Sequence, residues 1–400
     1  MDSITQAIDA AVPAKNYTSL CRVFSDYAMP GSVSWQSVGQ GEQRSIAAYF
    51  IQKATSTPGF LPAAFSHEEM MQVMTKALGH LPITVEKAAD NTLRQQMFEY
   101  LINSDDADYA GAARILSGMR MEEDAGSVYY MTAAARTDVY VRIAECFLSE
   151  DEIAESDAAV QKAGGIVESI PDKENHTSLI LRYKSTYARV LDSNRKFLQA
   201  AQRYHELSQS ATDLIDADDL LQMLGRGATC AILAPSGPQR GRVLGHICKD
   251  ERLSQLDRIP SFATHSKIIL KMHSHQILRP NELKQFESSL AEHQKALMGD
   301  GLTIMERGVV EHNMIAVGNL YSTIYLKELA LILGVTEKRA ESIAANMIMD
   351  GSLHGIIDQV DGLLVFEQDE SPDEGWDRSI TSFCLELNRT NEAIKATSSS

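Results

Sequence analysis

The chain has 400 residues, of which 44% are hydrophobic, and this content supports a large buried core and excludes a chain that is disordered throughout. Its 37 basic residues are outnumbered by 54 acidic ones, giving a net charge of -17 at pH 7. That balance disfavours broad attraction to nucleic-acid phosphates, so we expect protein partners. Five scattered cysteines form no C-x-x-C pair, which indicates free thiols in a reducing compartment.

The N-terminal stretch "MDSITQAIDAAVPAKNYTSL" lacks the basic region and apolar core of a signal peptide. No run reaches the roughly 18 apolar residues of a membrane span. We therefore expect a soluble protein of the cytoplasm and nucleus without membrane contact. Residues 1 to about 65 contain helical segments broken by clusters of Gly, Pro and Ser, and they predict little more.

Apolar residues at helical spacing fill nearly every window from about 66 to 295, which predicts an α-helical array. Alanine pairs recur at 112–113, 158–159 and 200–201, at intervals near the roughly 40 to 47 residues of two-helix repeats. Alanine is common in helices, so a single pair means little, but three pairs at similar spacing favour a helical-repeat solenoid of TPR or HEAT type. Aromatic residues are expected to fill the grooves between its layers: Tyr140, Phe147, Tyr183, Tyr187, Phe197 and Tyr204.

The segment 303–367 has a different pattern. It predicts the helix "TIMERGVVEHNMIAVGNLY", a second helix "LKELALILGV" closed by Gly334, and a third, "EKRAESIAANMIMD", with Thr336 as N-cap. Two apolar strands then flank Asp361-Gly362 in "GIIDQVDGLLVF", a strong hairpin signal. Three helices followed by a small β-hairpin predict a winged helix.

A winged helix raises the possibility of DNA recognition, which requires basic side chains on the third helix and on the wing. Residues 336–350 supply only Lys338 and Arg339 as bases, and the hairpin adds acidic residues alone. A nucleic-acid adaptor is therefore a disfavoured alternative.

Two segments could suggest catalysis. His273-x-His275 resembles the ligand pair of zinc isopeptidases, but no Asp follows at a suitable distance, and we expect a helix, on which these two side chains would point about 200° apart. The stretch "APSGPQRG" at 234–241 lacks the phosphate-loop and serine-elbow patterns, so we interpret it as a turn before the helix "RVLGHICKDERL". We predict no catalytic, cofactor-binding or metal-binding residues, and a lone metalloprotease is the weakest alternative.

The C-terminal segment predicts an amphipathic helix after the acidic linker "EQDESPDEG". Its apolar face would contain Trp376, Ile380, Phe383, Cys384, Leu387 and Ile394. So much apolar surface must be buried, either against the chain's own winged helix or, as we favour, in a bundle with helices of partner chains.

A helical solenoid ending in a winged helix resembles the PCI-domain family, found in the proteasome lid, the COP-nine signalosome and translation initiation factor three. The resemblance is closest to the signalosome. It is carried by "YARVLDSNRKFLQAAQRYHELS", "CAILAPSGPQRGRVLGHICKDER", "ERGVVEHNMIAVGNLY", "KRAESIAANMI", "GIIDQVDGLLVFE" and "WDRSITSFCLELN".

The resemblance implies a non-catalytic scaffold without cofactor or metal, in a complex that removes a ubiquitin-like modifier from cullin-RING ubiquitin ligases through the zinc chemistry of another subunit. Its partners would be other signalosome subunits, with the N-terminal arm directed toward the cullin and its RING protein. Interface residues would come from the hairpin: Ile356, Ile357, Val360, Leu363, Val365 and Phe366. Others would come from the terminal helix: Trp376, Ile380, Phe383, Leu387 and Ile394.

The expected architecture is thus all-α, with a solenoid at 1–295, a winged helix at 303–367 and a bundle helix at 376–396. Glycines in the loop 293–303 would make it a flexible joint that moves when the complex senses substrate. The paralogous non-ATPase subunit of the proteasome lid, which shares the architecture, remains the nearest alternative.

Overall fold

The structure is a computed structural model that describes residues 89–103, 107–127, 129–210, 214–297, 299, 301–366, 376 and 379–390. Contacts divide the chain into two compact units, a first unit ending at Asn194 and a second beginning at Arg195, with the short segment around Leu214 belonging to the first. The expectations for residues 1–88, and for Ile394 on the terminal helix, lie outside the described residues.

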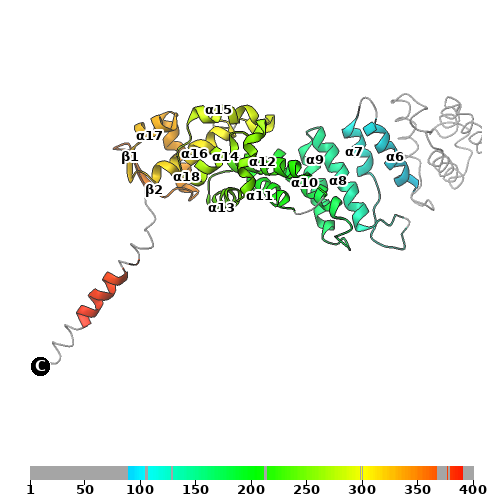
Figure 1. The fold of residues 1–400 in the computed structure, drawn as a ribbon, viewed down its shortest axis with the longest axis horizontal. Helices are drawn as coiled ribbons and strands as arrows, with labels where there is room; N and C mark the ends of the chain where they lie inside the picture. Colours follow the sequence, from blue (N-terminus) through cyan, green and yellow to red (C-terminus); the bar gives the residue numbers. More distant parts are fainter. Residues whose placement is uncertain are drawn as a thin grey trace, which may run out of the picture. The chain divides into compact units, whose positions relative to one another are not determined.

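The first unit is a stack of helices in which consecutive members pack against each other (Figure 1). It contains α6 (Ala89–Asn103), α7 (Tyr109–Ser117), α8 (Ala133–Ser149), α9 (Ile153–Val167) and α10 (Thr177–Ser193). Helix α8 begins where the side chain of Thr132 accepts a hydrogen bond from the backbone N–H of Ala135. It contacts α7, α9 and α10, and its apolar face forms the centre of this unit's core.

The alanine pairs mark close helix contacts, although not uniformly. Both members are fully buried at 112–113 and at 200–201, whereas Ala159 is buried and Ala158 is exposed. Small side chains at these positions allow the neighbouring helix to approach closely. The aromatic residues expected between layers are buried at Phe147, Phe197 and Tyr204 and half-buried at Tyr140, Tyr183 and Tyr187.

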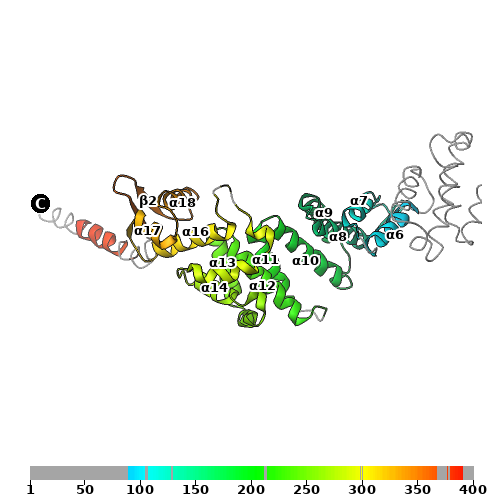
Figure 2. The same ribbon diagram turned by 90° about the horizontal axis from the view of Figure 1, so that it is seen from above.

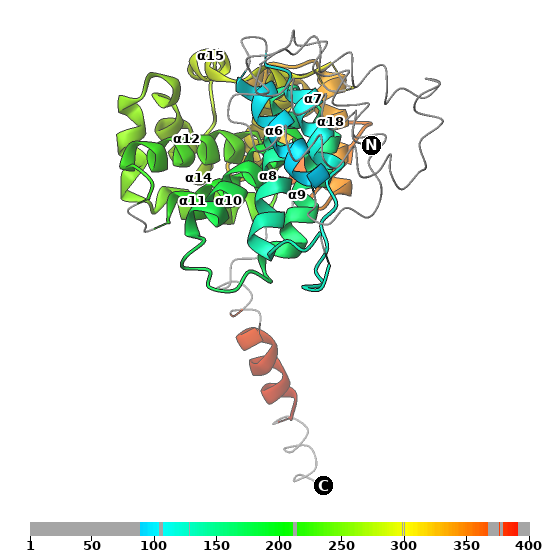
Figure 3. The same ribbon diagram turned by 90° about the vertical axis from the view of Figure 1, so that its right-hand side faces the viewer.

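The second unit starts with the helical half of the PCI-like arrangement (Figures 2 and 3). It contains α11 (Phe197–Ser208), α12 (Ala217–Leu233), α13 (Pro238–Cys248), α14 (His265–His273), α15 (Pro280–Ser289) and α16 (Ile304–Gly318), with short 3-10 helices at Glu251–Arg258, Pro260–Phe262 and Glu292–Lys295. Helix α12 contacts α11, α13, α14 and α16 and so lies at the centre of this half. The side chains of Thr303 and Glu306 form a reciprocal capping box at the start of α16.

The turn expected at 234–241 is present but shorter, because α13 already begins at Pro238, a residue type that fits the first turn of a helix, so the turn spans 234–237. A second local expectation was wrong. The segment around the histidine pair is not continuously helical: α14 ends at His273, and His275 has a left-handed backbone with φ of 53°. The helical-wheel argument against a shared metal therefore does not apply to this pair.

The winged helix is confirmed, with one more strand than expected. After α16 come β1 (Thr323–Tyr325), α17 (Leu326–Leu333), α18 (Glu337–Met349), β2 (Gly355–Asp358) and β3 (Leu363–Phe366). The sheet order is β1-β3-β2 and both pairings are antiparallel, so β3 is central and β1, which the sequence did not reveal, is an edge strand. Gly334 closes α17 with φ of 70°, whereas Thr336 occupies the N-cap of α18 without a side-chain hydrogen bond.

The sheet and α16–α18 share one hydrophobic core, which includes Met314, Leu329, Ala344 and Leu364. The mostly helical fold with a small sheet near the C-terminus confirms the predicted class, helical repeat plus winged helix. Among the helices that the structure describes, none has the length and hydropathy needed to cross a membrane.

Candidate interaction surfaces

Buried polar side chains of α16 form hydrogen bonds with the loop between α14 and α15, and these bonds connect the winged helix to the helical half. The Oδ1 atom of Asn313 accepts a hydrogen bond from the backbone N–H of Leu278 at 2.8 Å, and its Nδ2 donates to the carbonyl of the same residue at 3.0 Å. The neighbouring His312 places Nε2 at 2.9 Å from the carbonyl oxygen of Gln276. The loop between α14 and α15 has no regular secondary structure to pair its backbone N–H and C=O groups, and these two side chains supply the missing hydrogen-bond partners.

Burial also sets the charge state of His312. Removal from water lowers the pKa of this side chain to about 4, and nearby Arg240 and His275 act in the same direction. His275 stacks on His312 with ring centroids 6.5 Å apart. Within the described ranges, no group of three His, Cys, Asp or Glu side chains is arranged to hold a metal ion.

The turns of α16 that precede His312 border a cavity of about 660 Å³ inside the second unit. Glu311 accepts a hydrogen bond from the hydroxyl of Ser236 at 3.0 Å and pairs with Nε of Arg307 at 2.9 Å. The remaining walls are largely apolar and include Leu233, Pro238, Ile304, Ile343 and Met347. The acid and the base from α16 pair with each other, and Arg195 and Asp350 add one charge of each sign to the lining.

The sheet has two chemically different faces. Ile324, Leu364 and Ile357 are aligned across the three strands on the inner face and pack on the core. On the outer face Val365 lies between Thr323 and Ile356. The exposed fractions of Ile356 and Val365 are 59% and 37%, so this outer face is apolar and uncovered in the described chain.

The six hairpin residues predicted as interface therefore separate into two groups. Phe366 is buried, and Ile357 packs against the core, so these two positions support the fold. Ile356 and Val365 are exposed on the outer face, together with the half-buried Leu363, and Val360 is 95% exposed in the turn. Sequence analysis missed Tyr325 on β1, which is 56% exposed and pairs with Leu363; its alternation with the buried Ile324 is too short to be recognised as a strand.

The turn of the wing is ordered by its own polar groups. The Oδ1 atom of Asp358 accepts hydrogen bonds from the backbone N–H groups of Val360 and Asp361 at 2.9 and 3.2 Å. Gly362 follows with φ of 63°, a conformation that favours glycine. Gln359 donates to Glu341 of α18 at 2.6 Å, which connects the wing to the third helix.

The C-terminal helix is described at residues 379–390, and Trp376 precedes it in helical conformation. Its large apolar side chains are exposed: Trp376 at 72%, Ile380 at 45%, Phe383 at 65%, Leu385 at 58% and Leu387 at 53%. Four of these belong to the predicted bundle face, and Leu385 extends the apolar surface beyond it. A helix with this much exposed apolar area is typical of a segment that is covered by another chain.

Two family models match the chain. The model described as "PCI domain" matches residues 272–368, and the one described as "PSMD12/CSN4, N-terminal" matches residues 66–218. The first covers the end of the helical half and the whole winged helix. The second covers the described helices of the first unit and continues through α11 to the start of α12.

Curated relatives align over most of the chain. COP9 signalosome complex subunit 4 of Arabidopsis thaliana is 36% identical over 286 residues, which make up 70% of this chain and 68% of the relative. The proteins of the same name in Drosophila melanogaster and Dictyostelium discoideum are 35% and 34% identical, over 71% and 65% of this chain. These two alignments span slightly less than two thirds of the relatives, 65% and 62% of their lengths. On this evidence the chain belongs to the COP9 signalosome complex subunit 4 family.

Proposed function

We propose that the chain is a non-catalytic scaffold subunit of the COP9 signalosome, the complex that removes a ubiquitin-like modifier from cullin-RING ligases, with the zinc chemistry in a different subunit. The observation that carries this proposal is the terminal helix, whose apolar side chains are exposed in a chain of the subunit 4 family. Burial of such side chains contributes on the order of 2 kcal/mol each, which suits a helix held in a bundle of partner helices.

The winged helix supplies the second proposed contact. Both edge strands, β1 and β2, present backbone groups that a neighbouring strand can pair with. The outer face adds Tyr325, Ile356 and Val365, which are apolar or aromatic and exposed. Backbone pairing at an edge together with side-chain burial on the adjoining face would fix a neighbouring subunit in one orientation.

The proposal is tested by affinity purification of the full chain beside a chain ending at Glu370, with the co-purified proteins identified by mass spectrometry. We expect signalosome subunits with the full chain and their loss with the truncated one, because the truncation removes the exposed apolar helix. Recovery of proteasome-lid subunits would instead identify the chain as the paralogous subunit of the proteasome lid. The match to the family model described as "PSMD12/CSN4, N-terminal" is the observation that favours this alternative. Recovery of nucleic acid, or of no partner at all, would contradict the proposal.

A point-substitution version separates the helix face from the helix itself. The double change Phe383→Glu and Leu387→Glu is expected to abolish co-purification of the other subunits, because two charges would be placed where apolar surface must be buried. The controls are the single changes Phe383→Glu and Leu385→Glu, the second of which places one charge about 200° around the helix from Phe383; the first is expected to weaken co-purification and the second to retain the partners. Equal loss with the two single changes would show that no particular face of the helix is used.

The two faces of the sheet lead to opposite expectations for substitution by Asp. Ile357→Asp should destabilise the winged helix by about 3 kcal/mol, because an unpaired charge would enter the core. Val365→Asp should leave the melting temperature nearly unchanged, since the side chain is exposed, and should weaken assembly. Thermal denaturation and co-purification of both variants measure this; a folded Val365→Asp variant that assembles normally would exclude the outer face as an interface.

A further inference from the structure

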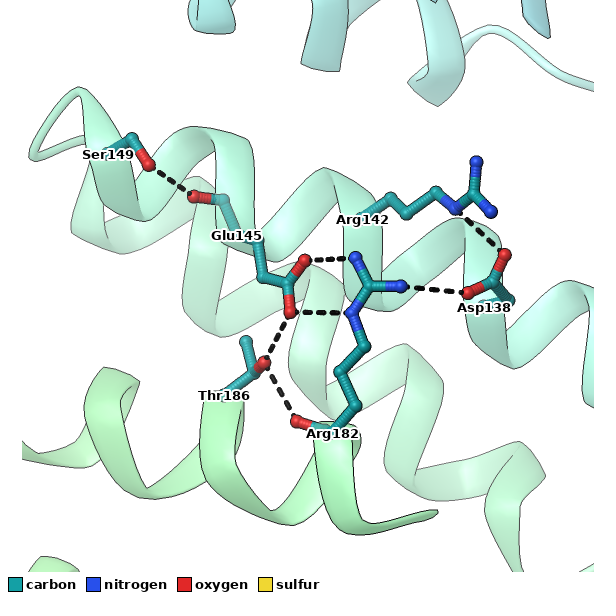
Figure 4. Close-up of polar contacts among 6 residues, drawn as sticks. All are labelled: Asp138, Arg142, Glu145, Ser149, Arg182 and Thr186. Carbon is teal, nitrogen blue, oxygen red and sulfur yellow. Dashed lines mark hydrogen bonds and ion pairs between the residues drawn. The ribbon is translucent and has the colours of Figure 1, made fainter. Parts of the chain in front are cut away.

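A pocket of about 370 Å³ lies within the first unit. Its lining residues fall between Phe98 and Arg182, and none of them belongs to the surfaces described above. Its walls come from α6, α7, α8 and α10. One side is apolar or aromatic, with Phe98, Ile102 and Tyr109, and the other is polar, with Arg142, Glu145 and Arg182 among its residues. Figure 4 shows the charged side chains of the polar side.

The carboxylates at this pocket are already occupied. Glu145 of α8 accepts hydrogen bonds from Nε of Arg182 at 2.9 Å and from its Nη2, and the hydroxyl of Thr186 lies 3.1 Å from the same carboxylate. Asp138 binds Nη1 of Arg182 through Oδ1 at 3.3 Å and pairs with Nε of Arg142 through Oδ2 at 2.8 Å. Every carboxylate oxygen of this network thus has a cationic partner.

Arg142 is the member with unused hydrogen-bonding capacity. Its Nε forms an ion pair with Asp138 without hydrogen-bond geometry, and its two terminal nitrogens have no hydrogen bond or ion pair among the residues that the structure describes. In Figure 4 one of these nitrogens points away from Asp138 and the other lies on the Asp138 side of the guanidinium, and no dashed line ends on either. The side chain is 38% exposed, and its guanidinium carbon lies 6.0 Å from the centre of the Phe98 ring. Arg142 therefore lines the pocket beside an aromatic surface with donors to spare, whereas the carboxylate of Glu145, which also lines the pocket, is already paired with Arg182.

This combination selects a ligand chemistry. A guanidinium edge with two free nitrogens binds a carboxylate through parallel hydrogen bonds, and such charge-assisted bonds are stronger than neutral ones. The adjoining ring of Phe98 and the side chains of Ile102 and Tyr109 would cover an apolar group next to that carboxylate. The pocket does not resemble a nucleophilic site, because burial raises the pKa of the Cys146 thiol to about 11 and keeps it protonated.

We propose that this pocket binds a short acidic segment of a partner protein, in which an Asp or Glu is adjacent to an aromatic or branched aliphatic residue, with Arg142 as the anchor for the carboxylate. The inference rests on the contacts of the first unit alone. Its test does not depend on whether the winged helix and the terminal helix take part in assembly.

The test uses a displayed library of random seven-residue peptides, selected on the immobilised full chain and counter-selected on the Arg142→Gln variant. Enriched peptides are then synthesised with a fluorescent label, and their affinity is measured by fluorescence anisotropy. Arg142→Gln keeps the length of the side chain without its charge, and Tyr109→Ala alters the apolar side without touching the ionic network. Arg114→Gln is the matched control, because Arg114 also forms one ion pair, with Glu152, and does not line the pocket.

The expected result is enrichment of peptides with an acidic residue beside an aromatic or aliphatic one. Their affinity should fall about tenfold or more with Arg142→Gln, with Tyr109→Ala, or when the peptide's acidic residue is replaced by its amide, and should stay within about twofold with Arg114→Gln. Enrichment without acidic residues, no enrichment, or binding that persists in Arg142→Gln would overturn the proposal. Circular dichroism melting of the variants establishes that each loss of binding comes from a folded chain.

Discussion

The Asn313→Ala variant is expected to lose roughly 3 to 4 kcal/mol of unfolding free energy. The side chain is 4% exposed and satisfies both the N–H and the carbonyl of Leu278, which is itself 1% exposed. Truncation would leave two buried backbone groups without partners, and each such group costs about 1 to 3 kcal/mol. We also expect the loop before α15 to detach from α16 in this variant, because the two hydrogen bonds of Asn313 connect the two segments.

Urea denaturation at pH 7.5 measures the global loss, and hydrogen–deuterium exchange of the peptide containing Leu278 measures the local one. Asn346→Ala is the matched control: Asn346 lies exposed on α18, so the same substitution should change stability by less than about 0.5 kcal/mol. If Asn313→Ala were as stable as the control, the buried hydrogen bonds could not be what attaches the winged helix.

The second large effect is an acid sensitivity of the second unit between pH 7 and pH 5. Burial lowers the pKa of both His265 and His312 to about 4, and these side chains are 1% and 5% exposed. His265 lies between the rings of Phe262 and Phe286 and places Nε2 2.8 Å from the hydroxyl of Thr229. At pH 5 the folded chain therefore keeps both rings predominantly neutral.

The sign of the effect follows from the direction of the shift. In the unfolded chain both histidines titrate near the ordinary value of about 6.5, so at pH 5 the unfolded state binds more protons than the folded state. The stability that comes from keeping the rings neutral is complete about one pH unit above 6.5 and is lost progressively as the pH falls through 6.5 toward 4. Two such groups should lower the unfolding free energy by about 4 kcal/mol between pH 7 and pH 5.

Chemical denaturation at a series of pH values measures this slope. The exposed His354 serves as control, since His354→Gln should keep the wild-type slope, whereas the double variant His265→Gln and His312→Gln should lose most of it while being less stable at pH 7. A wild-type stability that is flat from pH 7 to pH 5 would contradict the assignment of these two side chains as neutral and buried.

Local chemistry was sufficient to predict several elements of this protein from sequence. Gly334 ends α17 because only a residue tolerant of positive φ fits there, and Asp361-Gly362 predicts the turn between β2 and β3 for the same reason. The amphipathic spacing from Trp376 onward likewise indicated a helix with exposed apolar side chains. Each of these features depends on residues within a few positions of one another.

The features that sequence reasoning missed depend on distant residues. Strand β1 is only three residues long and exists because Thr323–Tyr325 pairs with β3, about 40 positions later. The two faces of the hairpin could be assigned only once Ile357 was seen against the core and Val365 away from it. The end of α14 at His273 is stabilised by α16, whose Asn313 and His312 bind the loop that follows.

The sequence by itself thus determined the class of fold, the winged helix and the apolar character of the terminal helix, because these follow from periodicity and from local backbone preference. The tertiary structure alone decided which hairpin residues are exposed, which histidines are buried and neutral, and that Arg142 faces a pocket beside Phe98. Burial, pKa and unpaired hydrogen-bonding capacity are properties of the surroundings that distant segments create, and no short stretch of sequence contains them.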